Sequence, residues 1–151
     1  FLDHGVTHLR PLVLRDVADA AEVPGMLILR LYAPLVFLNA RVLSNGMKGL
    51  ALGREGLRVV VLDATASSGI DSTAAEAFRE AREDLAAAGV ELWVVNARDE
   101  GWKVVVAALN AAGATIPPKF ESLADAVSRF ELSREDAPRT EAGAQLPGFR
   151  A

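Results

Sequence analysis

Blocks of apolar residues separated by polar, helix-forming segments predict strands and helices in alternation along this chain. Two solid apolar runs, Val59–Leu62 and Leu92–Val95, lack the alternation of a half-exposed strand. Such runs favour strands that are covered on both faces, as in a parallel sheet. A third strand is expected over Met26–Leu31, because Pro24 and Gly25 form a turn signal directly before it.

Helical periodicity appears between these runs. The clearest helix is expected over Asp71–Ala88, where apolar residues form one stripe and charged residues cover the rest. That stripe consists of Ala74, Phe78, Ala81 and Leu85. Further helices are expected over about Asn39–Leu52, over Gly101–Ala112, and after a cap at Ser122. The alternation predicts an α/β sandwich around a mostly parallel sheet.

Some segments fall outside this pattern. Residues 1–23 are expected to form an arm that holds one short edge strand at Leu12–Leu14. Residues Leu35–Leu38 are expected to be extended, and Phe120 to lie on a last short strand. From residue 133 to 151 the chain is charged and rich in Pro, Gly and Ala without periodicity, which is typical of a disordered tail.

Composition excludes several classes of protein. The chain has 151 residues, no cysteine and a net charge of -4. The lack of cysteine rules out disulfides and thiolate metal sites, and the lack of a Lys/Arg-rich run argues against nucleic-acid binding. No stretch offers the roughly 20 apolar residues that a membrane-spanning helix needs. The chain starts at Phe1 rather than Met and has no recognisable signal peptide, so we expect a piece of a longer polypeptide.

Motifs for catalysis are missing. The sequence contains no GxxxxGK[ST], GxGxxG, HExxH or GxSxG pattern. The two histidines, His4 and His8, lie in the expected arm, where solvated residues are favoured over a metal site. Without a base and a nucleophile in a shared pattern, we predict a protein that is not an enzyme and that holds no metal.

The best candidate for a functional site is the segment Val59–Phe78. A buried strand delivers Asp63 to its carboxyl end, and a helix begins near Ser72 and Thr73. Binding sites in open α/β sheets form beyond the carboxyl ends of the strands, and helix N-termini favour anions. A hydroxyl at this helix start could therefore accept a phosphate, which adds about -1.5 to -2 charges at neutral pH.

A purely structural explanation of the same residues stays open. Ser, Thr and Asp are the preferred residues at helix N-caps. Thr73 with Glu76 three residues later would form a capping box, and Asp63 could simply accept hydrogen bonds from loop amides.

At this segment the sequence resembles a known family. The segment resembles the conserved central part of STAS domains, which sulfate transporters and anti-sigma-factor antagonists share. It consists of an apolar strand, Asp63, a short loop and then Ile70-Asp71-Ser72-Thr73-Ala74. Bacterial antagonists carry Asp-Ser-Ser-Gly, and a partner kinase phosphorylates the first serine. Ser72 stands at that position, Thr73 at the second serine, and Ala74 replaces the glycine.

The upstream part is similar to the STAS domains of SulP-type anion transporters. There a Pro-Gly opens a strand and an "apolar-Phe-x-Asn-Ala" run leads into a helix, as do Val23–Leu31 and Val36–Ala40 here. Leu14–Val17 resembles the linker that enters such domains, whereas Tyr32 stands where the pattern often has Asp. The resemblance covers about residues 11–132 and leaves residues 1–10 as a linker or arm.

The resemblance implies an α/β fold of STAS type: a small, mostly parallel sheet with an antiparallel N-terminal edge, flanked by about four helices. It implies a regulatory and assembly domain at the cytoplasmic face of the cell membrane, C-terminal to a transport domain for sulfate- or bicarbonate-class anions. The partners would be that transmembrane domain of the same polypeptide, a regulatory protein and, in a homodimer, a second copy; nucleic acid is not expected.

Two alternatives stay open beside the transporter hypothesis. One is a free-standing phospho-switch protein like the anti-sigma-factor antagonists, with Ser72 and Thr73 as switch candidates. The other is a nucleotide-binding domain, and a nucleotide is the one cofactor left open. The candidate residues for an anion, nucleotide or protein partner are Asp63, Asp71, Asn96 and Arg98.

Overall fold

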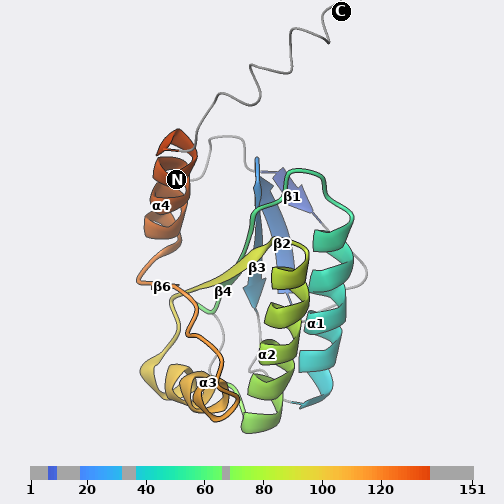
Figure 1. Ribbon diagram of the computed structural model, residues 1–151, viewed down its shortest axis with the longest axis vertical. Coiled ribbons are helices and arrows are strands. Elements are labelled where there is room, and N and C mark those ends of the chain that lie inside the picture. Colours follow the sequence, from blue (N-terminus) through green and yellow to red (C-terminus); the bar gives the residue numbers. More distant parts are fainter. Residues whose placement is uncertain (1–6, 10–17, 32–36, 66–68, 137–151) are drawn as a thin grey trace, which may run out of the picture.

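A computed structural model describes residues 7–9, 18–31, 37–65 and 69–136, which form six strands and four helices (Figure 1). Three strands come first, and helices and strands alternate after them. The strands are β1 (Thr7–Leu9), β2 (Ala18–Val23), β3 (Met26–Leu31), β4 (Val59–Asp63), β5 (Glu91–Val95) and β6 (Lys119–Phe120). The helices are α1 (Phe37–Leu52), α2 (Ser72–Ala87), α3 (Asp99–Ala111) and α4 (Leu123–Asp136).

The strands form one mixed sheet in the order β1-β2-β3-β4-β5-β6. β1 and β2, and likewise β2 and β3, pair antiparallel, whereas β3 to β6 pair parallel. This confirms the predicted sheet, mostly parallel with an antiparallel N-terminal edge. The carboxyl ends of β3, β4 and β5 therefore meet at one end of the sheet.

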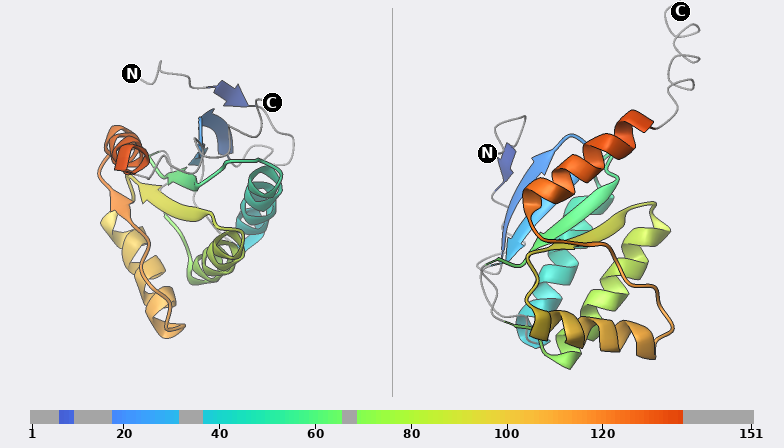
Figure 2. Two further views of the ribbon diagram at one scale, coloured as in Figure 1. Left: turned by 45° about the horizontal axis from the view of Figure 1, so that its top comes forward. Right: turned by 90° about the vertical axis from the view of Figure 1, so that its left-hand side faces the viewer.

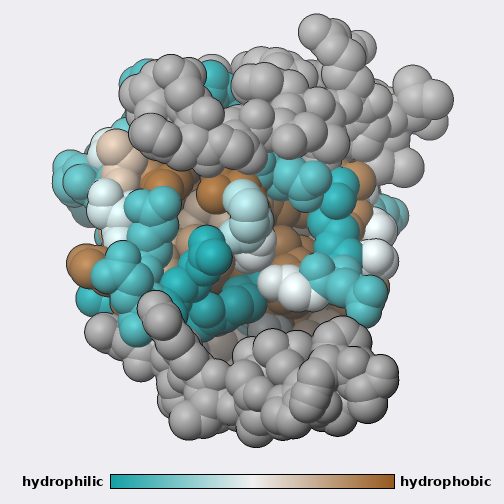
Figure 3. Space-filling view, turned by 90° about the horizontal axis from the view of Figure 1, so that it is seen from above, coloured by the Kyte–Doolittle hydropathy of each residue, from teal (hydrophilic) through white to brown (hydrophobic). Residues whose placement is uncertain are grey.

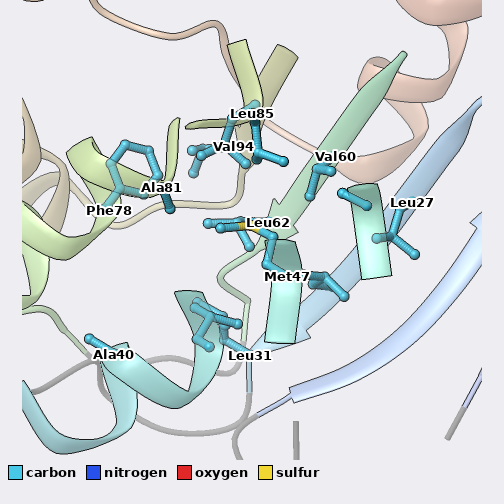
Figure 4. Packing of buried hydrophobic residues seen from close by; sticks show 14 of the residues in the cluster. Leu27, Leu31, Ala40, Met47, Val60, Leu62, Phe78, Ala81, Leu85 and Val94 are labelled. Carbon is cyan, nitrogen blue, oxygen red and sulfur yellow. The ribbon is translucent and has the colours of Figure 1, made fainter. Parts of the chain in front are cut away.

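Helices cover both faces of the sheet, which explains the solid apolar strands. α1, α2 and α3 lie on one face and α4 lies on the other (Figure 2). On the first face, Leu62 of β4 packs with Met47 of α1 and with Phe78, Ala81 and Leu85 of α2 (Figure 4). The predicted stripe of α2 is thus confirmed, since all four of its residues are buried.

On the second face, Phe130 of α4 is the centre of the core. Its ring is 1% exposed and meets the ring of Trp93 edge-on, with centroids 6.4 Å apart. Gly25, in the turn between β2 and β3, lies against the same ring and has a φ of +85°. A Cβ atom on Gly25 would approach Cζ of Phe130 to 2.9 Å, so both backbone conformation and space demand glycine at this turn.

The predicted arm is wrong for two of its segments. Ala18–Val23 is a strand that pairs along its whole length with β3, and Thr7–Leu9 pairs with it in turn. The run Ala-Asp-Ala-Ala-Glu-Val has little β-branched or aromatic character, so its strand state comes from pairing with β3 rather than from propensity. The edge strand expected at Leu12–Leu14 lies outside the described residues.

Three helix boundaries also differ from the prediction. α1 begins at Phe37, so residues 37 and 38 are helical rather than extended. α3 begins at Asp99, two residues before the expected start at Gly101. α4 continues to Asp136, so residues 133–136 are helical rather than part of a disordered tail. The exact residue at which a helix begins or ends depends on local hydrogen bonds, and hydrophobic periodicity does not reveal these.

Candidate functional site

Asp63 ends β4 with a buried carboxylate that accepts hydrogen bonds from three neighbouring segments. The residue is 1% exposed. Arg30 Nε, from β3, donates to Oδ2 over 3.2 Å. Thr65 donates to Oδ1 through its backbone N–H over 3.0 Å and through Oγ1 over 2.5 Å. Asn96, directly after β5, donates from Nδ2 to Oδ1 over 3.4 Å.

These bonds keep the carboxylate charged. Burial alone would raise the pKa of Asp63, but the hydrogen bonds from Thr65, Asn96 and Arg30 outweigh it and hold the pKa below the usual value. Asn96 reaches the site from a left-handed backbone conformation with a φ of 59°. The expected hydrogen bond from a loop amide to Asp63 is confirmed by the Thr65 N–H. Three of the four hydrogen bonds go to Oδ1 and one goes to Oδ2, so the charged carboxylate ties the ends of β3, β4 and β5 together.

Asp71 begins α2 as its N-cap. Its extended backbone has φ -96° and ψ 170°, and its side chain accepts a hydrogen bond from the N–H of Ala74 over 2.7 Å. The capping box predicted for Thr73 and Glu76 is therefore wrong, because the cap lies two residues before Thr73. Ser72 and Thr73 both fall in the first turn and are exposed.

An apolar pocket lies between α2 and α3 at the same end of the sheet. It has a volume of about 60 Å³. Leu31, Leu62 and Val94 contribute from the strands, and Phe78 and Trp102 contribute from the helices. Arg98 carries the one charge among the described residues that line it, and its side chain makes no hydrogen bond at the start of α3.

The sheet separates the Asp63 cluster from this pocket. Val61 packs on the α4 face and Leu62 on the other face, so successive side chains of β4 alternate and Asp63 points to the α4 side. The pocket opens on the side of α2 and α3. The sequence placed Asp63 and Arg98 in one candidate site, whereas the structure puts them on opposite faces.

The predicted site residues thus have three different roles. Asp63 and Asn96 meet in one cluster, Asp71 caps α2, and Arg98 lines the pocket. Sequence reasoning missed Arg30, although an Arg inside the apolar run Met-Leu-Ile-Leu-Arg-Leu was a signal that a buried acid needed a partner.

Metal binding and membrane spanning find no support in the described part of the chain. There, no three or more His, Cys, Asp or Glu side chains gather in a way that could hold a metal ion. No helix of the described residues is long and apolar enough to cross a bilayer. His4 and Tyr32 lie outside the described residues, and only the backbone of His8 is described.

Fold and sequence together define a family. A family model described as "STAS domain" matches residues 17–126, and the chain belongs to this family. The resemblance seen in Ile70–Ala74 and in the segments before it is thereby confirmed.

One curated protein is similar to this chain in sequence, and two solved structures are similar to it in fold. "Probable sulfate transporter 3.4" of Arabidopsis thaliana is 32% identical over 87 residues, which are 52% of this chain and 13% of that protein. The structure of the murine anion transporter Solute Carrier 26 family member A9 superposes with a TM-score of 0.66 at 16% identity, over 85% of this chain and 22% of the transporter. A protein from Thermotoga maritima described as an anti-sigma factor antagonist superposes with a TM-score of 0.64 at 14% identity, over 79% of this chain and 97% of its own.

These comparisons assign the chain to a domain type. It is homologous to the STAS domains of sulfate transporters, and it shares its fold with free-standing anti-sigma factor antagonists. The chain spans only 13% of the plant transporter.

Proposed function

We propose that this chain is the cytoplasmic regulatory and assembly domain of a SulP-type anion transporter of the sulfate or bicarbonate class. It would lie at the cytoplasmic face of the cell membrane, next to the transmembrane domain of the same polypeptide. The observation that carries this proposal is the 32% identity to a plant sulfate transporter over 87 residues, a match that covers 13% of that protein. The corresponding segment in that relative is one part of a much longer polypeptide.

The chemistry of the carboxyl-end site supports binding rather than catalysis. Asp63 is ionised and bonded to Arg30, Thr65 and Asn96, so it has no proton to give as a general acid and its hydrogen bonds serve to join neighbouring strand ends. The apolar pocket holds Arg98, and the described residues that line it offer no nucleophile next to a base. We therefore propose a domain that is not an enzyme.

The size of that pocket argues against a nucleotide. Its volume of about 60 Å³ is far below the roughly 300–1,000 Å³ of ordinary small-molecule pockets. One arginine, Arg98, is also a weak anchor for a polyphosphate. We propose that no nucleotide cofactor binds in this pocket, and adding GTP or ATP is then expected to leave the melting temperature unchanged, because a ligand of the folded state would raise it.

A protein partner suits the same end of the domain better. The exposed residues Ser72 and Thr73 lie two and three positions after Ile70, which lines the apolar pocket. A partner's apolar side chain in this pocket would lie near both hydroxyls. A phosphate on Ser72 would then change the charge at the contact and regulate it.

The second candidate is the free-standing phospho-switch, and one observation favours it. Asp71 caps α2 with its own side chain, so the hydroxyl of exposed Ser72 is not needed for capping. A phosphate there would gain from the helix N-terminus but would be repelled by the neighbouring carboxylate of Asp71.

One experiment separates the two candidates. Native cells are fractionated and blotted with an antibody against this domain. A membrane-bound band far above 16.0 kDa supports the transporter domain. A band of 16.0 kDa in the unsedimented fraction overturns it and favours the phospho-switch.

The switch is then tested at Ser72. The variant Ser72→Asp is compared with Ser72→Ala for capture of cell proteins, and both should keep the wild-type melting temperature because Ser72 is exposed. Equal capture by both variants would argue against a switch at this position.

A further inference from the structure

A second pocket lies at the opposite end of the sheet, where the parallel strands begin. It has a volume of about 380 Å³. The turn between β2 and β3 and the segment after α1 form it, with Glu22, Pro24, Gly25, Arg54, Glu55 and Leu57 among its lining residues. Figure 3 looks down on this end of the molecule, where polar side chains lie across the surface with apolar patches between them.

The polar groups of this pocket are not all satisfied by the described residues. Arg54 Nη1 pairs with Glu22 Oε2 over 2.9 Å, and the two side chains are 29% and 32% exposed. Arg54 Nε is buried and has no hydrogen-bond partner in the described part of the chain. Glu55 is exposed and belongs to none of the ion pairs among the described residues. Within the half-buried guanidinium, Nη1 thus has an acceptor but Nε has none among the described residues, and the exposed carboxylate of Glu55 forms no ion pair there.

The path of the chain leads to the same end. Thr7, the first residue of β1, is the register partner of Glu22 on β2. Neighbouring strands lie about 4.8 Å apart, so the polypeptide enters the sheet one strand away from a residue that lines the pocket. Any domain that precedes β1 is consequently tethered at this end of the sheet.

From these observations we propose that the pocket around Arg54 and Glu22 is where this domain docks against its transport domain. The occupant is a polar loop between membrane-spanning helices that presents an amide. The amide C=O would accept from the Arg54 guanidinium, and its N–H would donate to Glu55 or Glu22. An amide fits better than an anion, because the lining carries two carboxylates and one guanidinium. The inference rests on the proposed transporter function and adds the surface and the chemistry of the contact.

Docking at this end leaves the other end free. Ser72 and the apolar pocket lie beyond the carboxyl ends of the strands, whereas Arg54 and Glu22 lie at their start. β4 has five residues, which separates the two ends by about 16 Å at 3.3 Å per residue. A regulatory protein at Ser72 would not compete with the transport domain for the same surface.

Site-specific photo-cross-linking in the full-length membrane protein tests the docking surface. The photoreactive residue p-benzoylphenylalanine is placed at position 55, beside the proposed contact, or at position 73, at the opposite end. Both native residues are exposed, so neither replacement should disturb folding. We expect cross-links to loops of the transport domain from position 55 and none from position 73. Cross-links from position 73 alone, or from neither position, would overturn the inference.

A charge variant tests the role of Arg54 itself. Arg54→Ala should lose most of the cross-link from position 55, whereas Arg98→Ala, the matched control at the other end, should retain it. Melting temperatures of the isolated variants distinguish lost docking from lost folding. An unchanged cross-link in a folded Arg54→Ala variant counts against Arg54 as the docking residue. A native protein of 16.0 kDa would instead contradict the proposed transporter function. Failure of the docking inference and failure of the proposed function are therefore distinguishable.

Discussion

Arg30 and Asp63 face each other as register partners on β3 and β4, and Nε of the arginine donates to Oδ2 of the aspartate over 3.2 Å. The aspartate side chain is 2% exposed, whereas the arginine side chain is 51% exposed. The pair therefore joins a buried anion to a cation at the surface. Because the two side chains differ in burial, substituting them should lower the free energy of unfolding by different amounts.

Removing the aspartate should be much more costly than removing the arginine. Asp63→Ala leaves the donors of Asn96 and Thr65 without their acceptor and should lower the free energy of unfolding by about 2–4 kcal/mol. Arg30→Met keeps the aliphatic stem and should cost about 1 kcal/mol, since the arginine side chain is 51% exposed. Urea unfolding of both variants measures the difference. Equal costs would mean that the ion pair, rather than the hydrogen bonds to the carboxylate, dominates.

The same carboxylate makes stability depend on pH in a defined direction. The pKa of Asp63 in the folded chain lies below its usual 3.8, so the folded state favours the charged form. Its contribution is complete above about pH 5 and is lost as the pH falls through the folded-state pKa. The difference in unfolding free energy between wild type and Asp63→Asn should be constant from pH 5 to 7 and shrink below pH 4. A difference that grows on acidification would contradict the lowered pKa.

Replacing each of two glycines by alanine should change the stability of the fold in opposite directions. Gly49 lies inside α1, and a Cβ atom there would meet nothing within 4 Å, so Gly49→Ala should stabilise by about 0.5–1 kcal/mol. Gly25→Ala should destabilise by at least about 1–2 kcal/mol, because its φ of +85° is strained for alanine and Phe130 already fills the space. Thermal unfolding of the two variants gives both signs in one experiment. A destabilised Gly49→Ala would indicate a contact that the helix makes elsewhere.

Phe78 should be a main contributor to the core between α2 and the sheet. It is 7% exposed, so Phe78→Ala should lower the free energy of unfolding by about 3–5 kcal/mol. Leu52, at the end of α1 and 57% exposed, serves as the control, and Leu52→Ala should cost less than about 0.5 kcal/mol. Chemical unfolding with a fixed m-value tests both. Similar losses in the two variants would mean that the apolar stripe is not what holds α2.

Hydrophobic pattern predicted the parts of the fold that burial controls. β3 and the stripe of α2 were predicted as observed, because strands covered on both faces and one-sided helices leave clear patterns. β2 was missed because its residues are mainly Ala, Asp and Glu, and only the register with β3 makes it a strand. Pairing between segments is not recorded in local composition.

The sequence named some residues of the candidate site, whereas it missed Arg30 and could not give the arrangement. The sequence pointed to Asp63, which ends β4, and to Asn96 and Arg98, which follow β5. It could not say that the sheet places the first two on one face and Arg98 beside a pocket on the other. The direction of a side chain at a strand end depends on the backbone torsion angles there. Asn96, with its positive φ of 59°, is an example.

The contact between Gly25 and Phe130 bears on how a fragment of this protein should be cut for expression. The family match stops at residue 126, one turn before Phe130. A fragment trimmed to that match would lose the ring that closes over Gly25 and Trp93, and would present Val61, Trp93 and Val95 of the sheet to water. Contiguous exposed apolar surface of this kind promotes aggregation. Residues 127–136 are therefore as necessary for a well-behaved sample as the strands that they cover.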